Sequence, residues 1–194
     1  MLFRSRQVPV EIWRTWIVRF LGLIPRGRVV LIGHGAECER AQNIQQTLPP
    51  SVLGRIWDIT GRTTIHELAQ TLSRCQRVIG SDTGPLHLAA AVGVPVIGWY
   101  FARARVHETG PYGPNHRVWQ AQSMDNGPVV PADWPIEPSL DLLLNDFPRS
   151  APHWSEWISH IDRWGTYYSE AGQTSPPPQE REHVWHELSQ AVPV

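Results

Sequence analysis

Two spacings of apolar residues alternate along residues 10–119. Between residues 10 and 24, apolar side chains recur every three or four positions, which places them on one face of a helix. Residues 28–32 are a short run rich in β-branched residues, typical of a strand buried on both faces. Further helices are predicted at 36–48, 64–75 and 86–92, and further strands at 56–58, 77–80, 94–100 and, as a last edge strand, 117–119. This alternation predicts an α/β fold of Rossmann-like type, a parallel sheet with helices on both faces.

The pattern changes after residue 122, and most of the 18 prolines lie beyond residue 100. We therefore divide the chain into a Rossmann-like domain, residues 1–122, and a Pro- and Trp-rich helical tail, residues 123–194. Helices are predicted in the tail at 138–145, 152–168 and 180–191, with a linker at 174–178. Apolar side chains form a helical stripe in the second of these, for which packing in a core or against another surface is the main expectation and attachment to a membrane surface a lesser one.

The composition bears on three classes of function, namely nucleic-acid binding, membrane insertion and metal binding. The net charge is -1 and charged residues make up 18% of the chain, so no basic surface indicates a nucleic-acid partner. The 10 tryptophans indicate either aromatic packing or a surface that another domain covers. The two cysteines have no spacing motif, and no run reaches the ~18 apolar residues of a transmembrane segment. We expect a cytoplasmic protein, with peripheral attachment at the inner membrane surface as an alternative. His183 and His186 fit a solvated helix face better than a metal site.

The segment that is most informative about chemistry is 80–91, which follows a predicted strand and opens a predicted helix. Ligands bind at this end of the strands in an open α/β sheet. The first helical turn offers free N–H groups and the positive end of the helix dipole, Gly84 lets the backbone approach an anion, and Thr83 adds a hydroxyl. Asp82 would repel a phosphate and is better suited to accept hydrogen bonds from amides or sugar hydroxyls. The alternative is a purely structural turn between strand and helix.

The motifs around this segment resemble those of one enzyme family. Residues 82–91 read Asp-Thr-Gly-Pro-Leu-His-Leu-Ala-Ala-Ala, which is similar to the signature of the ADP-heptose:lipopolysaccharide heptosyltransferases, glycosyltransferase family 9. Segments at 30–37, 58–68, 93–95 and 110–116 resemble further parts of the family in the same order. The resemblance covers about residues 6–121.

The resemblance implies a GT-B architecture, in which two Rossmann-like domains face each other across a cleft. The matched stretch corresponds to the C-terminal, donor-binding domain. The N-terminal domain, which supplies the acceptor surface and an aspartate general base in the family, is expected to be absent from this sequence, so its catalytic residues stay unknown. A complete enzyme would transfer heptose from ADP-heptose, with inversion, to a lipopolysaccharide or another glycan or lipid-linked acceptor, and would need neither a cofactor nor a metal ion.

The resemblance also implies a donor site. The implied donor-binding residues are Asp82, Thr83, Gly84, Pro85, His87, Glu37, Thr60, Gly61 and Arg6. Glu37 would bind the ribose hydroxyls, or would only serve the dipole of its helix. His87 would reach the diphosphate and heptose, or would only brace the loop. Arg6 stands where the family has a lysine near the phosphates.

One departure from the family favours a second interpretation. The family carries Gly-Pro-Thr after the strand that ends at Tyr100, whereas this chain has Phe101-Ala102-Arg103. The leading alternative is a non-catalytic module that binds a nucleotide or sugar phosphate, or pairs with a separate N-terminal acceptor-domain chain. A third interpretation is an inactive, truncated fragment.

Overall fold

The structure, a computed structural model, describes residues 7–102, 104–121, 133–144, 154–162 and 165–172. Its elements in chain order are α1 (Val10–Leu23), β1 (Val29–Leu31), η2 (Gly35–Glu37), α2 (Cys38–Gln46), α3 (Pro50–Leu53), β2 (Ile56–Asp58), α4 (Ile65–Leu72), β3 (Val78–Ser81), α5 (Gly84–Ala91), β4 (Val96–Tyr100), α6 (Val106–Thr109), β5 (Arg117–Ala121), α7 (Ile136–Leu144), β6 (Trp154–Asp162) and β7 (Gly165–Glu170). The helices and strands predicted before residue 122 are thereby confirmed, and the short helices α3 and α6 are additional.

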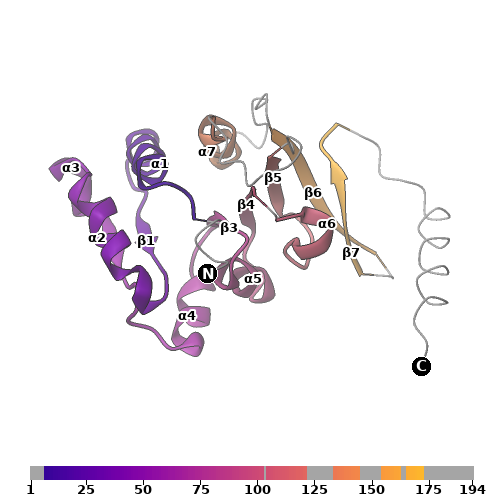
Figure 1. Ribbon diagram of the computed structural model, residues 1–194, viewed down its shortest axis with the longest axis horizontal. Helices are drawn as coiled ribbons and strands as arrows, with labels where there is room; N and C mark the ends of the chain where they lie inside the picture. Colours follow the sequence, from indigo (N-terminus) through magenta and orange to yellow (C-terminus); the bar gives the residue numbers. More distant parts are fainter. Residues whose placement is uncertain (1–6, 103, 122–132, 145–153, 163–164, 173–194) are drawn as a thin grey trace.

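The strands form two hydrogen-bonded groups. β1 and β2 pair in parallel, with Val29 opposite Ile56. The second group has the order β3-β4-β5-β6-β7, in which the first three strands are parallel and the last two continue antiparallel. Figure 1 shows β1 with α2 and α3 at one end of the molecule and the β6–β7 hairpin toward the other. The carboxyl ends of β1, β2, β3 and β4 are therefore where the predicted site residues must be sought.

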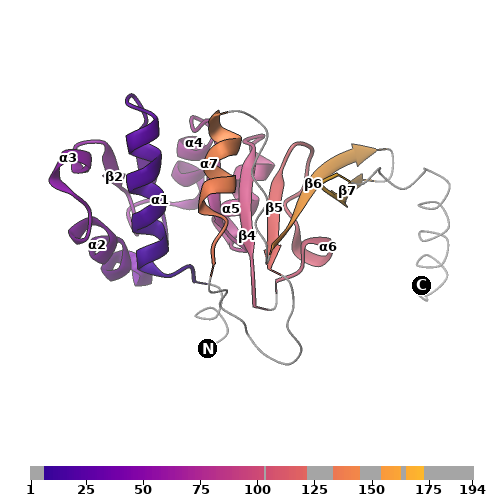
Figure 2. The ribbon, with the colours of Figure 1, turned by 90° about the horizontal axis from the view of Figure 1, so that it is seen from above.

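Side chains on β4 alternate between two apolar layers on opposite faces of the sheet. Ile97 and Trp99 belong to a core that includes residues of α1, α2 and α7. Val96 and Tyr100 belong to a second core with residues of α4, α5 and α6. Figure 1 shows α1 and α7 on one side of the strands and α4 and α5 on the other, and Figure 2 shows α1 and α7 on the side nearer the viewer. Both faces are thus covered by helices, which confirms the predicted fold class.

Aromatic rings fill much of the space between α1 and the sheet. Trp13 on α1 stacks on Trp99, with ring centroids 5.3 Å apart. Trp134 lies 5.7 Å from Trp99 and 5.6 Å from Trp154, again between ring centroids. Pairs at such separations add about 0.5–1.5 kcal/mol beyond the burial of their area. For these rings, packing in the core is the explanation of the high tryptophan content.

The described part of the tail corrects one prediction. Helix α7 confirms the helix expected near 138–145, but the helix expected at 152–168 is wrong, because β6 and β7 occupy this stretch. β6 pairs antiparallel with β5, placing Trp154 opposite Ala121 and Trp157 opposite Val118. This pairing satisfies backbone groups that an edge strand would expose. β5 is therefore an interior strand and not the last edge of the sheet.

The helix expected at 180–191, with His183 and His186, and the linker at 174–178 lie outside the described residues. None of the helices that the structure does describe is both long and apolar enough to cross a bilayer.

Candidate functional site

The turn between β3 and α5 is open at its tip. Thr83 is the N-cap of α5, and its carbonyl accepts the amides of Leu86 and His87 at 3.0 and 3.4 Å. Its hydroxyl donates to the carbonyl of Ser81 at 3.2 Å instead of capping the helix. Thr83 and Gly84 are exposed, and a Cβ on Gly84 would meet no other atom within 4 Å. Since Pro85 has no N–H, the Gly84 amide is the first helix donor open to an anion.

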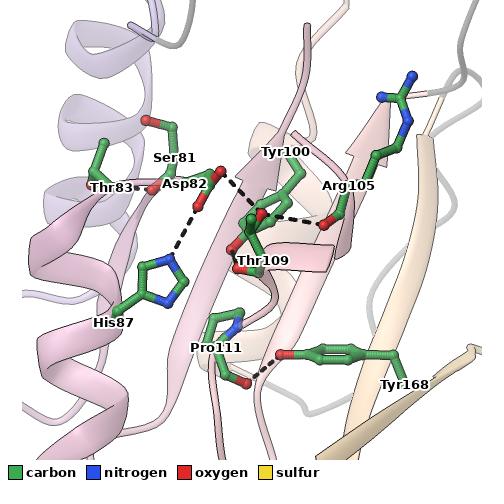
Figure 3. A network of polar contacts seen from close by, with 9 residues as sticks. All are labelled: Ser81, Asp82, Thr83, His87, Tyr100, Arg105, Thr109, Pro111 and Tyr168. Carbon is green, nitrogen blue, oxygen red and sulfur yellow. Dashed lines mark hydrogen bonds and ion pairs between the residues drawn. The ribbon is translucent and has the colours of Figure 1, made fainter. Parts of the chain in front are cut away.

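Asp82 faces inward, away from this tip. It is 6% exposed, and its carboxylate has two partners from different elements. Oδ1 lies 3.0 Å from Nε2 of His87 on α5, and Oδ2 accepts from the hydroxyl of Thr109 on α6 at 3.1 Å. Figure 3 shows the carboxylate between these two side chains. The structure thus places Asp82 and His87, two of the predicted donor-binding residues, in contact with each other, and adds Thr109, which the sequence did not single out.

Further hydrogen bonds hold the α6 segment against the sheet. The Tyr100 hydroxyl, at the end of β4, donates to the carbonyl of Thr109 at 2.7 Å. The Tyr168 hydroxyl on β7 donates to the carbonyl of Pro111, just beyond α6 (Figure 3). Burial raises the pKa of Tyr168, so this hydroxyl remains a donor at neutral pH. β4 and β7 therefore both fix the position of the segment that supplies Thr109.

The turns after β1 and β2 contain a second group of predicted site residues, and the backbones of the two turns are in contact. The amide of Gly61 donates to the carbonyl of Gly33 at 2.9 Å. Gly61 has a φ of +69°, and a Cβ there would lie 2.8 Å from the Cα of Gly35. A Cβ on Gly33 would lie 2.8 Å from Oε2 of Glu37 and 3.2 Å from Cγ2 of Thr60. Glu37, Thr60 and Gly61 are thus assembled in one place.

Two carboxylates accept hydrogen bonds within this second group of residues. Oε2 of Glu37 accepts the amide of His34 at 2.9 Å, as part of a capping box at the start of η2. Asp58, at the end of β2, accepts the amide of Thr60 at 2.9 Å and the side-chain amide of Gln45 at 2.8 Å. Glu37 therefore has a structural role at a helix start, whereas the sequence had left open ribose binding or service to the helix dipole. Thr60 is buried, whereas Gly61 is exposed.

Arg105, the N-cap of α6, and Arg40 on α2 are two described cations near these turns. Both bonds of the Arg105 guanidinium go to backbone carbonyls, those of Ala102 at 3.2 Å and Ala104 at 3.1 Å. Figure 3 shows this side chain directed away from Asp82. On α2, burial lowers the pKa of Arg40, an effect that the nearby Glu37 carboxylate partly offsets. Arg6, the predicted phosphate contact, lies outside the described residues.

The segment after β4 also turns inward. Phe101 is buried, and its ring meets the ring of Trp134 edge-on, with centroids 4.9 Å apart. Ala102 has a φ of +57°, which carries the chain away from the end of β4. Phe101, which stands at the first position of the family's donor-facing Gly-Pro-Thr segment, thus packs in the core.

The comparison with known proteins agrees with this arrangement. A family model described as glycosyltransferase family 9 (heptosyltransferase) matches residues 1–130. The chain belongs to glycosyltransferase family 9. Over 79 residues it is 32% identical to lipooligosaccharide heptosyltransferase 2 of Haemophilus influenzae, a match covering 40% of this chain and 23% of that protein. Over 55 residues it is 38% identical to the lipopolysaccharide core heptosyltransferase OpsX of the same organism, covering 28% of this chain and 16% of OpsX.

Solved structures of the family share the fold. A glycosyl transferase family 9 protein from Veillonella parvula superposes with a TM-score of 0.57 at 21% identity, over 65% of this chain and 35% of that one. The ADP-heptose LPS heptosyltransferase II of E. coli gives a TM-score of 0.55 at 21% identity, over 63% and 35% of the two chains. The fold is therefore that of one Rossmann-like half of the GT-B family 9 architecture, and the chain spans about a third of these relatives.

Proposed function

We propose that this family 9 chain binds an ADP-linked heptose as the donor half of a heptosyltransferase. The observation that carries the proposal is the exposed start of α5, where the Cβ position of Gly84 meets nothing within 4 Å. Helix N-termini of this kind bind phosphate groups through backbone N–H groups and the helix dipole. Membership of a heptosyltransferase family supports a nucleotide-sugar diphosphate as the anion.

The donor would lie across the two groups of residues. Its diphosphate and sugar would meet Thr83, Gly84, Pro85 and the exposed part of His87. Its nucleoside would meet the turns after β1 and β2, where Glu37 lies beside Gly33, whose carbonyl accepts the amide of the exposed Gly61. The packing of α4 against α5 supports this, because these helices begin just after the two groups of residues.

The chemistry assigned to this chain is stabilisation of the leaving group. An acceptor hydroxyl attacks the anomeric carbon, the bond to the diphosphate breaks, and ADP leaves with its added negative charge. The start of α5 would stabilise that charge without a metal ion or cofactor. We assign the general base and the glycan or lipid-linked acceptor surface to an N-terminal acceptor domain, on the same or a separate chain.

Titration calorimetry with ADP and with ADP-heptose tests the donor site. We expect both to bind the full chain, and Gly84→Ala to weaken both by about tenfold or more, because a methyl group would displace the anion from an amide whose charged hydrogen bond contributes about 1.5–3 kcal/mol. Gly22→Ala on α1 is the matched control, since its Cβ also meets nothing within 4 Å, and it should bind as the parent does. Failure of both ligands to bind, or equal affinity for the Gly84 variant, would contradict the proposal.

One observation favours a second function, a nucleotide-binding module that does not support transfer. Phe101, at the first position of the family's donor-facing segment, is buried, and its ring contacts the ring of Trp134. In this chain the first side chain of that segment therefore faces the core. This module would bind ADP and ADP-heptose equally well. Heptose transfer after mixing with a family 9 acceptor domain would exclude it, and a preference for ADP-heptose would argue against it.

A further inference from the structure

The two members of the Asp82–His87 pair differ sharply in access to solvent. The side chain of Asp82 is 4% exposed, whereas that of His87 is 38% exposed. An ionised carboxylate only accepts hydrogen bonds, so the 3.0 Å contact requires a proton on Nε2 of His87. Nδ1 then carries a lone pair and only accepts, so it can meet a hydroxyl of a ligand but not a phosphate oxygen. A ligand at the start of α5 therefore reaches His87 before it reaches Asp82.

Thr109 approaches the other oxygen of the same carboxylate. Its hydroxyl lies 3.1 Å from Oδ2 of Asp82 and 3.2 Å from the carbonyl of Arg105, and it has one hydrogen to give. A bond back to a carbonyl four residues earlier is common for threonine at a helix end. A carboxylate is the stronger acceptor, so the bond to Asp82 is preferred. The Tyr100 hydroxyl holds the Thr109 carbonyl from β4, which fixes the distance (Figure 3).

We propose that Asp82 and Thr109 are positioning residues of the donor site. Thr109 orients the Asp82 carboxylate, and the carboxylate fixes the tautomer and ring orientation of His87, so that Nδ1 accepts a hydrogen bond from a sugar hydroxyl of the donor. This differs from the direct donor contact that the family resemblance implied for Asp82. The inference rests on the proposed donor site, but its geometric part holds without any ligand.

The first test compares two substitutions at Thr109. Thr109→Val removes the hydroxyl at nearly constant volume, and Thr109→Ser keeps it. With ADP-heptose as the probe, we expect the valine variant to bind about threefold to tenfold more weakly, the effect of one hydrogen bond of about 0.5–1.5 kcal/mol, and the serine variant to bind within about twofold of the parent. Circular dichroism melting of all three proteins checks that they fold. Equal ADP-heptose affinity of the folded valine and serine variants would overturn the role of Thr109.

The second test reads the His87 ring directly in the parent protein, by ¹⁵N NMR with the signal assigned from His87→Gln. Without ligand, we expect the Nε2–H tautomer, and on adding ADP-heptose a shift of Nδ1 with little change at Nε2. An Nδ1–H tautomer, or a shift confined to Nε2, would overturn the proposal even if the valine variant does not fold. If the parent binds no ADP-heptose, the donor-site proposal fails, while the tautomer in the free protein still decides the geometric part.

Discussion

Substitution of Gly61 by alanine probes the contact between the turns after β1 and β2. Gly61 has a φ of +69°, and an L-residue in this left-handed region costs about 1–2 kcal/mol. A Cβ there would also lie 2.8 Å from the Cα of Gly35 and from Sγ of Cys38. The Gly35 backbone cannot rotate away as a side chain can, and overpacking of this kind costs about 1–3 kcal/mol. We expect Gly61→Ala to lower the free energy of unfolding by about 2–5 kcal/mol in total.

Two other glycines separate these costs. Gly93 has a φ of +81° and open space around its Cβ position, so Gly93→Ala should show the backbone cost alone, about 1–2 kcal/mol. Gly22, in helix α1, has open space and no positive φ, so Gly22→Ala should be neutral or stabilising by about 0.5–1 kcal/mol.

Urea unfolding followed by tryptophan fluorescence and by far-ultraviolet circular dichroism measures all three variants against the parent. A loss of 2–5 kcal/mol corresponds to a fall in melting temperature of about 5–20 °C for a chain of this size. The comparison between Gly61→Ala and Gly93→Ala is decisive. If the two lose the same free energy, the close approach of Gly61 to Gly35 contributes nothing, and the account of how these two turns assemble is refuted.

Two further predictions concern stability. Burial lowers the pKa of His116, whose Nδ1 accepts the amide of Val96 at 3.3 Å and whose Nε2–H donates to the carbonyl of Tyr112 at 3.0 Å. As the pH falls, the unfolded chain therefore binds a proton at His116 before the folded protein does, and the free energy of unfolding should fall below about pH 6.5. Urea unfolding between pH 7.5 and 5.5 should show a smaller fall in the His116→Gln variant than in the parent. Equal falls in the two proteins would contradict the assignment. At the start of α4, Thr64 and Glu67 form a capping box. Thr64→Ala should therefore lower the free energy of unfolding by about 1 kcal/mol, whereas Thr64→Ser should change it little. Equal melting temperatures of the alanine and serine variants would exclude a capping role.

The parallel strands were predictable because each is a short apolar run between a helix and a turn. The β6–β7 hairpin was not, because its apolar residues fit two periods. Trp154 and Trp157 are three positions apart, which is helical spacing, yet in the strand they enter opposite cores. A strand covered on both faces carries apolar residues at odd and even positions alike, so spacing alone cannot separate it from a helix. Pairing with β5 decides the outcome, and that interaction is not visible in the local sequence.

The same limit applies to the candidate site. The turn at 82–87 was predictable from its place between a strand and a helix and from the family motif. Thr109 was not, because its contact with Asp82 spans 27 residues and it belongs to no motif. One local signal was available, since a carboxylate next to an anion-binding helix start is electrostatically unfavourable. Its explanation is that Asp82 faces the interior, where His87 and Thr109 engage it.

Carboxylates at or just after the ends of three strands form hydrogen bonds within the protein and not with a charged ligand. Glu37, after β1, accepts the amide of His34; Asp58, the last residue of β2, accepts the amide of Thr60; and Asp82, after β3, contacts His87. Each negative charge is thereby engaged by donors from its own surroundings, which lowers its repulsion of a nearby anion. A diphosphate bound at Gly84, as proposed, would then be held mainly by backbone amides and the dipole of α5, which act only at contact distance. Such a site would select a ligand by the fit of its phosphates to the turn at Gly84.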